Sequence, residues 1–353
     1  MTENTSQDAA QAIPVTVLTG FLGSGKTTLL NRLLAHSDME ETAVLINEFG
    51  EIGLDHLLVR EVSENIVMLN SGCLCCTVRG DLPDSLRELF VMRGKGDIPA
   101  FRRAVVETTG LADPAPIIQS LMTDPVIIPR YRLDGIVTTV DAVFGSKQLQ
   151  EHPESVKQAA VADRLVLTKS DIAGEDAVGA VTEHLRRLNP AAPIIITRLG
   201  DAEPGDLLDC GLFDTKRKIA DVERWLNEEA YADAEHHNAH DVNRHDDRIS
   251  AFCMTLDDPI EWKAFVIWID MLLSTHGESL LRVKGVLNVA GQEKPVAIHG
   301  VQHVFYPPAT LAHWDGEDRR SRLVFITRDL NRQAIMETFR GVYEHHVAAA
   351  DSP

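Results

Sequence analysis

The strongest constraint on this chain is a glycine-rich stretch near its N-terminus, Gly20-Phe21-Leu22-Gly23-Ser24-Gly25-Lys26-Thr27-Thr28. It fits the phosphate-binding pattern of Gly, four residues, then Gly-Lys-Ser/Thr. Residues 15–19 before it form a short β-branched run that is typical of a buried strand. Residues 28–34 after it are apolar at helical spacing. A strand, a glycine loop and a helix in this order make the motif specific, so the sequence predicts a P-loop fold.

Each part of this loop has a physical role in holding phosphates. Glycine lacks a Cβ atom, so the backbone can point successive N–H groups at phosphate oxygens. The positive end of the following helix adds to the attraction. Lys26 is expected to neutralise the β- and γ-phosphates, and the Thr27 hydroxyl to ligate Mg²⁺. The expected nucleotide-binding residues of the loop are Gly20, Gly23, Ser24, Gly25, Lys26, Thr27 and Thr28.

Length and charge narrow the function classes. A chain of 353 residues is longer than one hydrophobic core usually serves, so two domains are expected. The net charge of −19 argues against a nucleic-acid-binding surface, which needs a basic patch. No apolar run is long enough to span a bilayer, and residues 1–12 are polar, unlike a secretory signal. We therefore expect a cytoplasmic protein that binds neither membranes nor nucleic acid.

A first switch is predicted where the strand over residues 42–46 ends in Asn47-Glu48-Phe49-Gly50-Glu51-Ile52-Gly53. Its two glycines and its acidic and amide side chains indicate a loop. The loop follows the phosphate-loop helix, where nucleotide switches place their first mobile segment. Glu48 and Glu51 are therefore candidate ligands for Mg²⁺ or for a second metal, with a solvated acidic loop as the alternative.

Three of the five cysteines, Cys73, Cys75 and Cys76, lie together after a strand predicted over residues 65–69. An odd number of cysteines with three so close together does not suit a set of structural disulfides, and it favours metal or redox chemistry. Three thiolates suit zinc, which takes one further ligand tetrahedrally. That ligand is expected from a switch-loop glutamate, a histidine, water or a receiving protein, which favours metal transfer over a permanent structural site. Buried structural thiols or a redox pair are the alternatives.

A second switch is predicted where the strand over residues 103–106 ends in Glu107-Thr108-Thr109-Gly110. An acidic residue at this place in a P-loop domain can hold Mg²⁺ through water. Gly110 is expected to offer its N–H to the γ-phosphate, and residues 111–114 to form the switch itself. The expected catalytic residues are Lys26, Thr27, Glu107 and Gly110.

Guanine selection is predicted from Thr168-Lys169-Ser170-Asp171, which follows a strand over residues 163–167. The Asp171 carboxylate can accept hydrogen bonds from guanine N1–H and the exocyclic amine, which adenine does not offer. Lys169 is expected to pack its stem over the base, and Thr168 stands where Asn is commoner. Alone the tetrad is a weak signal, but its place after a phosphate loop favours GTP over ATP.

Strands and helices alternate over residues 13–227, which predicts an α/β domain with a mainly parallel sheet and helices on both faces. The phosphate loop, both switches, the cysteine loop and the base tetrad all follow strand ends. They are therefore expected to share one rim, outside the carboxyl ends of the strands, where such sheets bind ligands.

Residues 228–247 are acidic and histidine-rich, which indicates a linker that either collects metal or is simply a solvated hinge. Residues 248–345 are expected to form a smaller α+β domain. Residues 1–12 and 346–353 are expected to be tails. In the smaller domain, strands are predicted over 249–256, 281–289, 296–304 and 322–326, and helices over 261–273 and 331–342.

These motifs together resemble the CobW-type GTPases, relatives of the hydrogenase and urease nickel-insertion GTPases. The resemblance rests on residues 19–28, 47–53, 72–76, 107–114 and 168–171. The Cys-x-Cys-Cys loop between the two switches is its specific mark. The resemblance implies GTP hydrolysis with Mg²⁺, zinc held by the three clustered cysteines, and delivery of that zinc to a client metalloenzyme.

Three alternatives stay open. The first is a GTPase that inserts cobalt or iron for a corrinoid or nitrile-hydrolysing enzyme. The second is a GTP-gated thiol sensor without metal cargo, which predicts a reversible disulfide within the cysteine cluster. The third is an ATP-dependent small-molecule kinase. A second copy of the chain is a candidate partner, alongside the unknown client.

Overall fold

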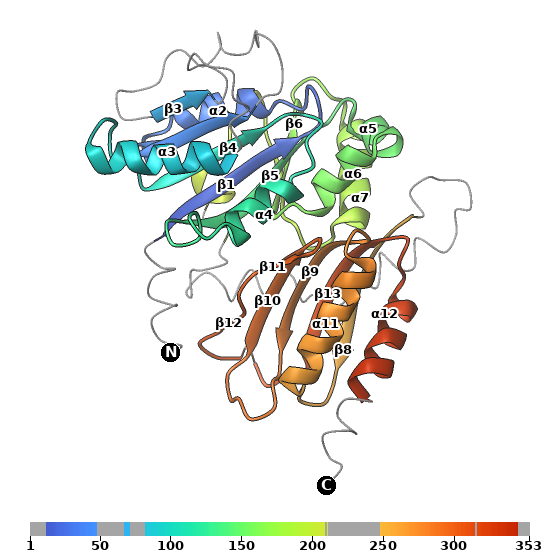
Figure 1. The fold of residues 1–353 in the computed structure, drawn as a ribbon. Coiled ribbons are helices and arrows are strands. Elements are labelled where there is room, and N and C mark those ends of the chain that lie inside the picture. Colours follow the sequence, from blue (N-terminus) through green and yellow to red (C-terminus); the bar gives the residue numbers. More distant parts are fainter. Residues whose placement is uncertain are drawn as a thin grey trace. The chain divides into compact units, whose positions relative to one another are not determined.

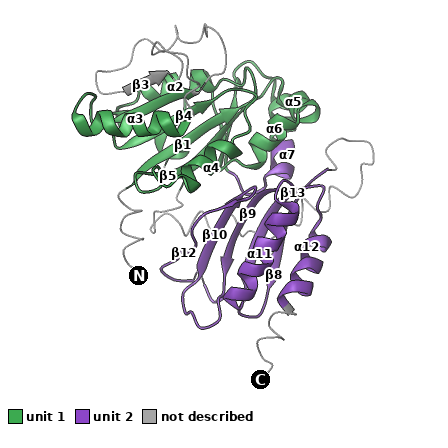
Figure 2. Ribbon diagram, in the orientation of Figure 1, with its two compact units in different colours: residues 1–183, 193–213 green, residues 184–192, 214–353 purple. Residues whose placement is uncertain are grey.

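The structure is a computed structural model, and it describes residues 12–47, 67–70, 82–208, 210, 248–314 and 316–344. The chain divides into two compact units, which Figure 2 colours separately. One unit contains residues 1–183 and 193–213, and the other contains residues 184–192 and 214–353. Each unit is built around a sheet of its own. Within the described ranges, no helix is both long enough and apolar enough to cross a membrane.

The first unit is organised by a seven-stranded sheet in the order β3-β2-β4-β1-β5-β6-β7. Every pair of neighbouring strands is parallel, which confirms the predicted α/β fold. β1 lies between β4 and β5, so the loop after β1 emerges near the middle of the carboxyl edge. The strands are β1 (Ile13–Gly20), β2 (Thr42–Asn47), β3 (Val67–Asn70), β4 (Arg103–Thr108), β5 (Tyr131–Asp141), β6 (Arg164–Thr168) and β7 (Ile194–Ile196).

Helices cover both faces of this sheet. Helix α2 (Lys26–Leu34) buries four leucines in a cluster with Leu18 of β1 and Val105 of β4. Helices α3 (Leu82–Lys95) and α4 (Ala115–Thr123) lie side by side over the face that Figure 1 turns to the viewer. The other helices that the structure describes up to residue 208 are a 3-10 turn (Ser37–Met39), α5 (Gly145–Glu151), α6 (Pro153–Ala160), α7 (Glu175–Leu188), whose last residues belong to the second unit, and α8 (Pro204–Leu207).

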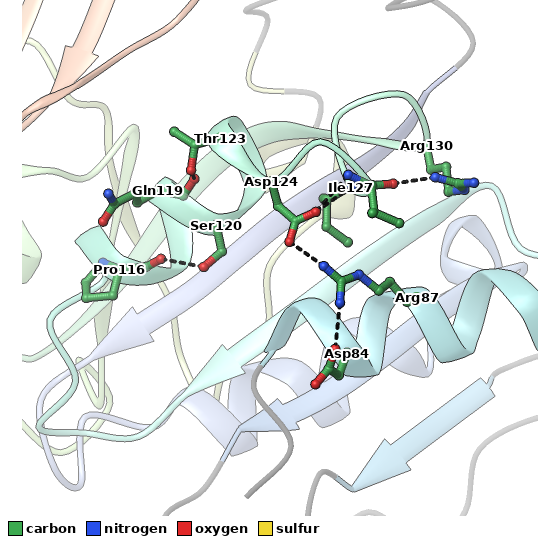
Figure 3. A network of polar contacts seen from close by, with 10 residues as sticks. Asp84, Arg87, Pro116, Gln119, Ser120, Thr123, Asp124, Ile127 and Arg130 are labelled. Atoms are coloured by element: carbon green, nitrogen blue, oxygen red, sulfur yellow. Dashed lines mark hydrogen bonds and ion pairs between the residues drawn. The ribbon is translucent and has the colours of Figure 1, made fainter.

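A network of polar contacts ties α3 to the segment after α4 (Figure 3). Arg87 on α3 donates to Asp84 at 2.8 Å and to Asp124 at 2.6 Å. The other oxygen of Asp124 accepts from the backbone N–H groups of Val126 at 2.8 Å and Ile127 at 3.2 Å. These bonds, led by that from Val126, hold the pKa of the Asp124 carboxyl below its usual range. The carboxylate therefore stabilises the fold at neutral pH, and this contribution is lost as the pH falls through the folded-state pKa.

The second unit contains a six-stranded sheet in the order β11-β10-β9-β13-β8, with β12 paired to β10. All these pairs are antiparallel. Helices α11 (Trp262–His276) and α12 (Arg332–Phe339) cover one face of the sheet (Figure 1). Between them Trp268 is fully buried and meets Phe339 edge-on at 5.0 Å. The strands are β8 (Ile249–Leu256), β9 (Leu280–Leu287), β10 (Val296–Val301), β11 (Val304–Phe305), β12 (Ala309–Thr310) and β13 (Ser321–Arg328).

Two details differ from the sequence-based expectation. The sequence predicts one strand over residues 296–304, but the chain turns at Gln302, which has a φ of 50°, and pairs back as β11. The sequence predicts a helix up to residue 342, but α12 ends at Phe339 and continues as a π-helical turn over Arg340–Glu344. The first difference arises because a non-glycine residue adopts the left-handed conformation, which the sequence does not signal.

Candidate nucleotide-binding site

The loop between β1 and α2 requires glycine at its start. Gly20 has a φ of 142°, and a Cβ atom there would lie 2.2 Å from Thr139 Oγ1 and 2.4 Å from the Thr139 carbonyl oxygen. Gly25, with a φ of 88°, is the N-cap of α2. Helix α2 therefore begins directly after the loop, so its first N–H groups and its positive dipole end face an anion held there.

The two glycines Gly20 and Gly23 offer a matched test of this loop. Gly20→Ala is expected to lower the free energy of unfolding by about 3 kcal/mol, because the new methyl group overlaps backbone and side-chain atoms of β5. Gly23 has a φ of 72°, but nothing lies within 4 Å of its Cβ position. Gly23→Ala should therefore cost only about 1 kcal/mol of backbone strain. Urea denaturation measures both values, and equal losses would show that the close approach at Gly20 is incorrect.

Lys26 and Thr27 begin α2 and face the site with a charge and a hydroxyl. The Lys26 side chain is buried, and its Nζ donates to the carbonyl oxygens of Gly20 at 2.9 Å and Phe21 at 3.3 Å. Thr27 Oγ1 donates to Glu107 Oε1 at 2.8 Å. Because β1 and β4 pair with Leu18 opposite Glu107, the carboxylate is held at the edge from which the loop emerges. A hydroxyl beside a carboxylate is an oxygen donor set that suits Mg²⁺.

Hydroxyl groups connect the phosphate loop to three neighbouring strand ends. Thr108 Oγ1 of β4 donates to Thr19 Oγ1 of β1 at 2.8 Å. Thr139 Oγ1 of β5 lies 2.6 Å from Ser24 Oγ, and Thr168 Oγ1 of β6 donates to the Ser24 carbonyl oxygen at 2.6 Å. All five residues are buried. The bond from Thr168 therefore links the base tetrad to the phosphate loop. The motifs in the sequence do not indicate Thr139, whose only signal is its place near the end of a strand.

Lys169 and Asp171 of the base tetrad lie just after β6, and the side chain of each has a polar partner that fixes its position. Lys169 has a φ of 58°, and its Nζ forms an ion pair with the buried Asp141 at 2.7 Å. The other oxygen of Asp141 accepts from the Val143 N–H at 2.7 Å, so this carboxylate is fixed at the end of β5. Asp171 is exposed, and its Oδ1 accepts from the Leu199 N–H at 3.2 Å. The structure thereby places Lys169 and Asp171 on the loop edge next to the phosphate loop.

The second switch meets the phosphate loop directly. Gly110 is buried, and a Cβ atom on it would lie 2.7 Å from the backbone N and Cα of Leu22. The loop from Thr109 to Ala112 closes as a turn, because the Ala112 N–H donates to the Thr109 carbonyl oxygen at 3.1 Å. Gly110, Glu107 and Lys26 thus come from separate elements to one edge of the sheet, as the parallel strand order requires.

The metal ligands predicted in the first switch and the cysteine loop lie outside the described residues. These ligands are Glu48, Glu51, Cys73, Cys75 and Cys76. Linker residues 228–247 also fall outside them. Over the parts of the chain that the structure describes, no three His, Cys, Asp or Glu side chains gather in a way that could hold a metal ion.

Known proteins resemble this chain over nearly its whole length. Over 330 residues the chain is 34% identical to the zinc chaperone YjiA of Escherichia coli, which covers 94% of this chain and 98% of the relative. It is 28% identical over 353 residues to the zinc chaperone CobW of a Sinorhizobium species, covering 92% and 95% of the two chains. The crystal structure of Zn(II)-bound YjiA GTPase from E. coli matches with a TM-score of 0.71 and 30% identity, covering 94% of this chain and 99% of that one.

Family descriptions match both halves of the chain. Residues 14–196 match the nucleotide-binding domain of CobW/HypB/UreG, and these residues contain the phosphate loop, Glu107 and the base tetrad. Residues 249–343 match the C-terminal domain of the cobalamin synthesis protein CobW. The chain therefore belongs to the CobW/HypB/UreG family of nucleotide-binding proteins and carries the CobW C-terminal domain as its second part.

Proposed function

We propose that this chain is a GTP-hydrolysing zinc chaperone, which holds zinc in its cysteine loop and transfers it to client metalloproteins. Two relatives that share nearly its full length are named zinc chaperones. GTP hydrolysis is supported mainly by the 2.8 Å hydrogen bond from Thr27 Oγ1 to Glu107 Oε1, close in sequence to the buried Lys26. This arrangement combines a cation for the phosphates with a hydroxyl and a carboxylate for a metal ion.

The phosphate groups of GTP are bound by the loop. Lys26 neutralises charge on the β- and γ-phosphates, and the loop N–H groups donate to their oxygens. Thr27 would hold Mg²⁺ directly and Glu107 would hold it through water, and the ion would supply positive charge to neutralise the phosphate oxygens. Gly110 offers its N–H to the γ-phosphate. Turnover is expected to be slow without a partner, because the sequence has no clear glutamine or arginine finger.

The base is selected by Asp171 and covered by the stem of Lys169. The ion pair between Lys169 and Asp141 directs the Lys169 ammonium to one side, which leaves its aliphatic stem to pack on the base plane. Asp171 accepts from the guanine N1–H and amine groups, and adenine cannot satisfy the same carboxylate.

Asp171→Asn is expected to weaken GTP binding roughly tenfold to a hundredfold, the loss associated with hydrogen bonds to a charged group. The same change should improve binding of xanthosine triphosphate, whose additional carbonyl accepts from the new amide. Titration with fluorescent analogues of the two nucleotides measures the preference. Asp176→Asn, at the exposed start of α7, is the matched control and should bind both nucleotides as the natural chain does. Unchanged discrimination in Asp171→Asn would exclude the tetrad as the base site.

Zinc is the cargo in this proposal. Cys73, Cys75 and Cys76 supply three thiolates, and the fourth ligand is Glu48, Glu51, a histidine, water or a group of the receiving protein. The cysteine loop lies between the two switches in sequence, so rearrangement of the switches on hydrolysis changes access to the metal. A cysteine thiol must lose its proton to bind zinc, so zinc affinity should fall as the pH is lowered.

Metal analysis of the purified protein, with and without a non-hydrolysable GTP analogue, tests the proposal. The expected result is one zinc per chain in one nucleotide state and a reduced content in the other. Stoichiometric cobalt or iron in place of zinc would point to another cargo. A metal-free protein with a reversible disulfide in the cysteine loop would indicate a thiol sensor and not a chaperone. A preference for ATP over GTP would exclude the GTPase activity.

A further inference from the structure

Helix α6 contacts both the phosphate loop and the second switch. At its start, the ring of His152 stacks on Phe21 of the phosphate loop, with centroids 4.6 Å apart and planes at 23°. Further along the helix, Gln158 is fully buried and Lys157 is partly buried. Both side chains reach the loop of residues 109–114. One short helix therefore supports two parts of the nucleotide site that are far apart in sequence.

Gln158 binds the second switch through its side-chain amide. Its Nε2 donates to the carbonyl oxygen of Gly110 at 3.2 Å and to that of Ala112 at 3.0 Å. Two acceptors around one atom require the NH₂ end of the amide, which has two donors. The Gln158 backbone is itself fixed to the sheet, because Thr138 Oγ1 of β5 donates to its carbonyl oxygen at 2.8 Å.

These two bonds determine where the switch N–H groups point. In a planar trans peptide, the carbonyl oxygen and the N–H of the next residue point in opposite directions. Holding the Gly110 and Ala112 carbonyls toward Gln158 therefore turns the N–H groups of Leu111 and Asp113 away from it. The Thr109 carbonyl is fixed in the same way by its bond from the Ala112 N–H, which orients the N–H of Gly110.

Lys157 adds an ion pair to this contact. Its Nζ lies 3.1 Å from Asp113 Oδ2, and the two side chains are 27% and 33% exposed. The other oxygen of Asp113 accepts from the Ala115 N–H at 3.0 Å, at the start of α4. The ion pair thus holds the end of the switch loop, while Gln158 holds its centre. A partly exposed ion pair is weaker than two hydrogen bonds from a fully buried side chain, so Gln158 should have the larger effect.

We propose that Gln158, assisted by Lys157, is a positioning residue that holds the second switch in place to receive the γ-phosphate of GTP. The inference rests on the GTPase function proposed above. The effect should be specific to GTP, because the Gly110 N–H that is expected to bind the γ-phosphate belongs to the loop that Gln158 holds, and GDP has no γ-phosphate. A residue that only stabilised the fold would affect both nucleotides equally.

The test compares Gln158→Met with the unaltered full-length chain. Methionine keeps the volume and apolar packing of the side chain but removes both donors. Affinities for GDP and for a non-hydrolysable GTP analogue are measured by titration, and GTP turnover by phosphate release. The analogue should bind about tenfold more weakly, in line with the loss of two hydrogen bonds, while GDP affinity stays within about twofold. The turnover number for GTP should fall by at least about tenfold.

Two further variants keep the result interpretable. Gln150→Met, on an exposed part of α5, is the matched control and should leave all three measurements unchanged. Lys157→Met should shift the ratio of analogue to GDP affinity in the same direction as Gln158→Met, by a smaller factor. If Gln158→Met does not fold, the affinity ratio of Lys157→Met tests the proposal in its place.

Equal losses for the analogue and GDP, or no loss for either, would overturn the positioning role. If the unaltered chain still hydrolysed GTP in that case, the proposed GTPase function would stand and only the role of Gln158 would be wrong. If the unaltered chain neither bound nor hydrolysed GTP, the proposed function itself would fail. The two failures are therefore distinguishable in one set of measurements.

Discussion

Lys26→Ala is expected to lower GTP turnover by about 10²–10³-fold, the loss found when an enzyme loses one preorganised hydrogen-bond donor to the transition state. Lys26 is the only residue of the phosphate-loop motif whose side chain carries a positive charge. Its buried ammonium already lies against the loop carbonyls of Gly20 and Phe21, so it needs little reorganisation to reach a phosphate. Nucleotide binding should weaken as well, and more for GTP than for GDP, because Lys26 is expected to contact the γ-phosphate, which GDP lacks.

Phosphate release under saturating GTP and titration with both nucleotides provide the measurement. Lys147→Ala removes an equivalent charge from α5, where the side chain is 72% exposed and 3.9 Å from Glu151, and it should behave as the unaltered chain does. GTP affinity and turnover that survive in Lys26→Ala would mean that phosphates bind elsewhere. Thermal unfolding of both variants shows whether a loss reflects misfolding.

Replacing Cys73, Cys75 and Cys76 together by serine is expected to abolish tight zinc binding, with a loss of affinity of at least about 10³-fold. Serine keeps the size of the side chain but is not deprotonated near neutral pH, so the site loses all three thiolate ligands. Nucleotides should still bind, with the affinities of the zinc-free unaltered chain, because these cysteines are separate from the phosphate loop and the base tetrad.

Competition with a zinc-binding dye, and nucleotide titration of the same samples, measure the two properties together. Cys253→Ser is the control, since Cys253 lies in β8 of the second unit, and it should retain zinc. Stoichiometric zinc in the triple variant would refute the assigned ligands. Loss of nucleotide binding along with zinc would instead indicate that the cysteine loop supports the fold of the nucleotide site.

The nucleotide half of the fold could be predicted because its signals are local. Buried parallel strands are continuous apolar runs, and glycine spacing marks the loop after β1. The sequence predicts strands that lead to Glu107 and to Thr168, and the structure has them as β4 and β6. Once the sheet is parallel, the ends of these strands lie on one edge, which is why Glu107 and Thr168 could be expected beside the phosphate loop from sequence order alone.

The supporting contacts could not be predicted because they join residues distant in sequence. Gln158 reaches Gly110 from 48 positions away, and Ser24 meets Thr139 from 115 positions away. No local pattern indicates which buried glutamine or threonine will find such a partner. Helices α5 and α6 are only seven and eight residues long, too short for apolar periodicity to reveal them. Gln302 shows the same limit, since its turn depends on a conformation that glycine usually signals.

The central claim is that nucleotide and zinc are coupled through loops on one edge of the sheet. The most direct test measures zinc affinity of the full chain with a non-hydrolysable GTP analogue and again with GDP. We predict that the two affinities differ by about 5- to 150-fold, the range typical of coupling between two sites, and that zinc shifts the ratio of the nucleotide affinities by the same factor. Identical zinc affinity in both states, together with nucleotide affinities that zinc leaves unchanged, would contradict the account.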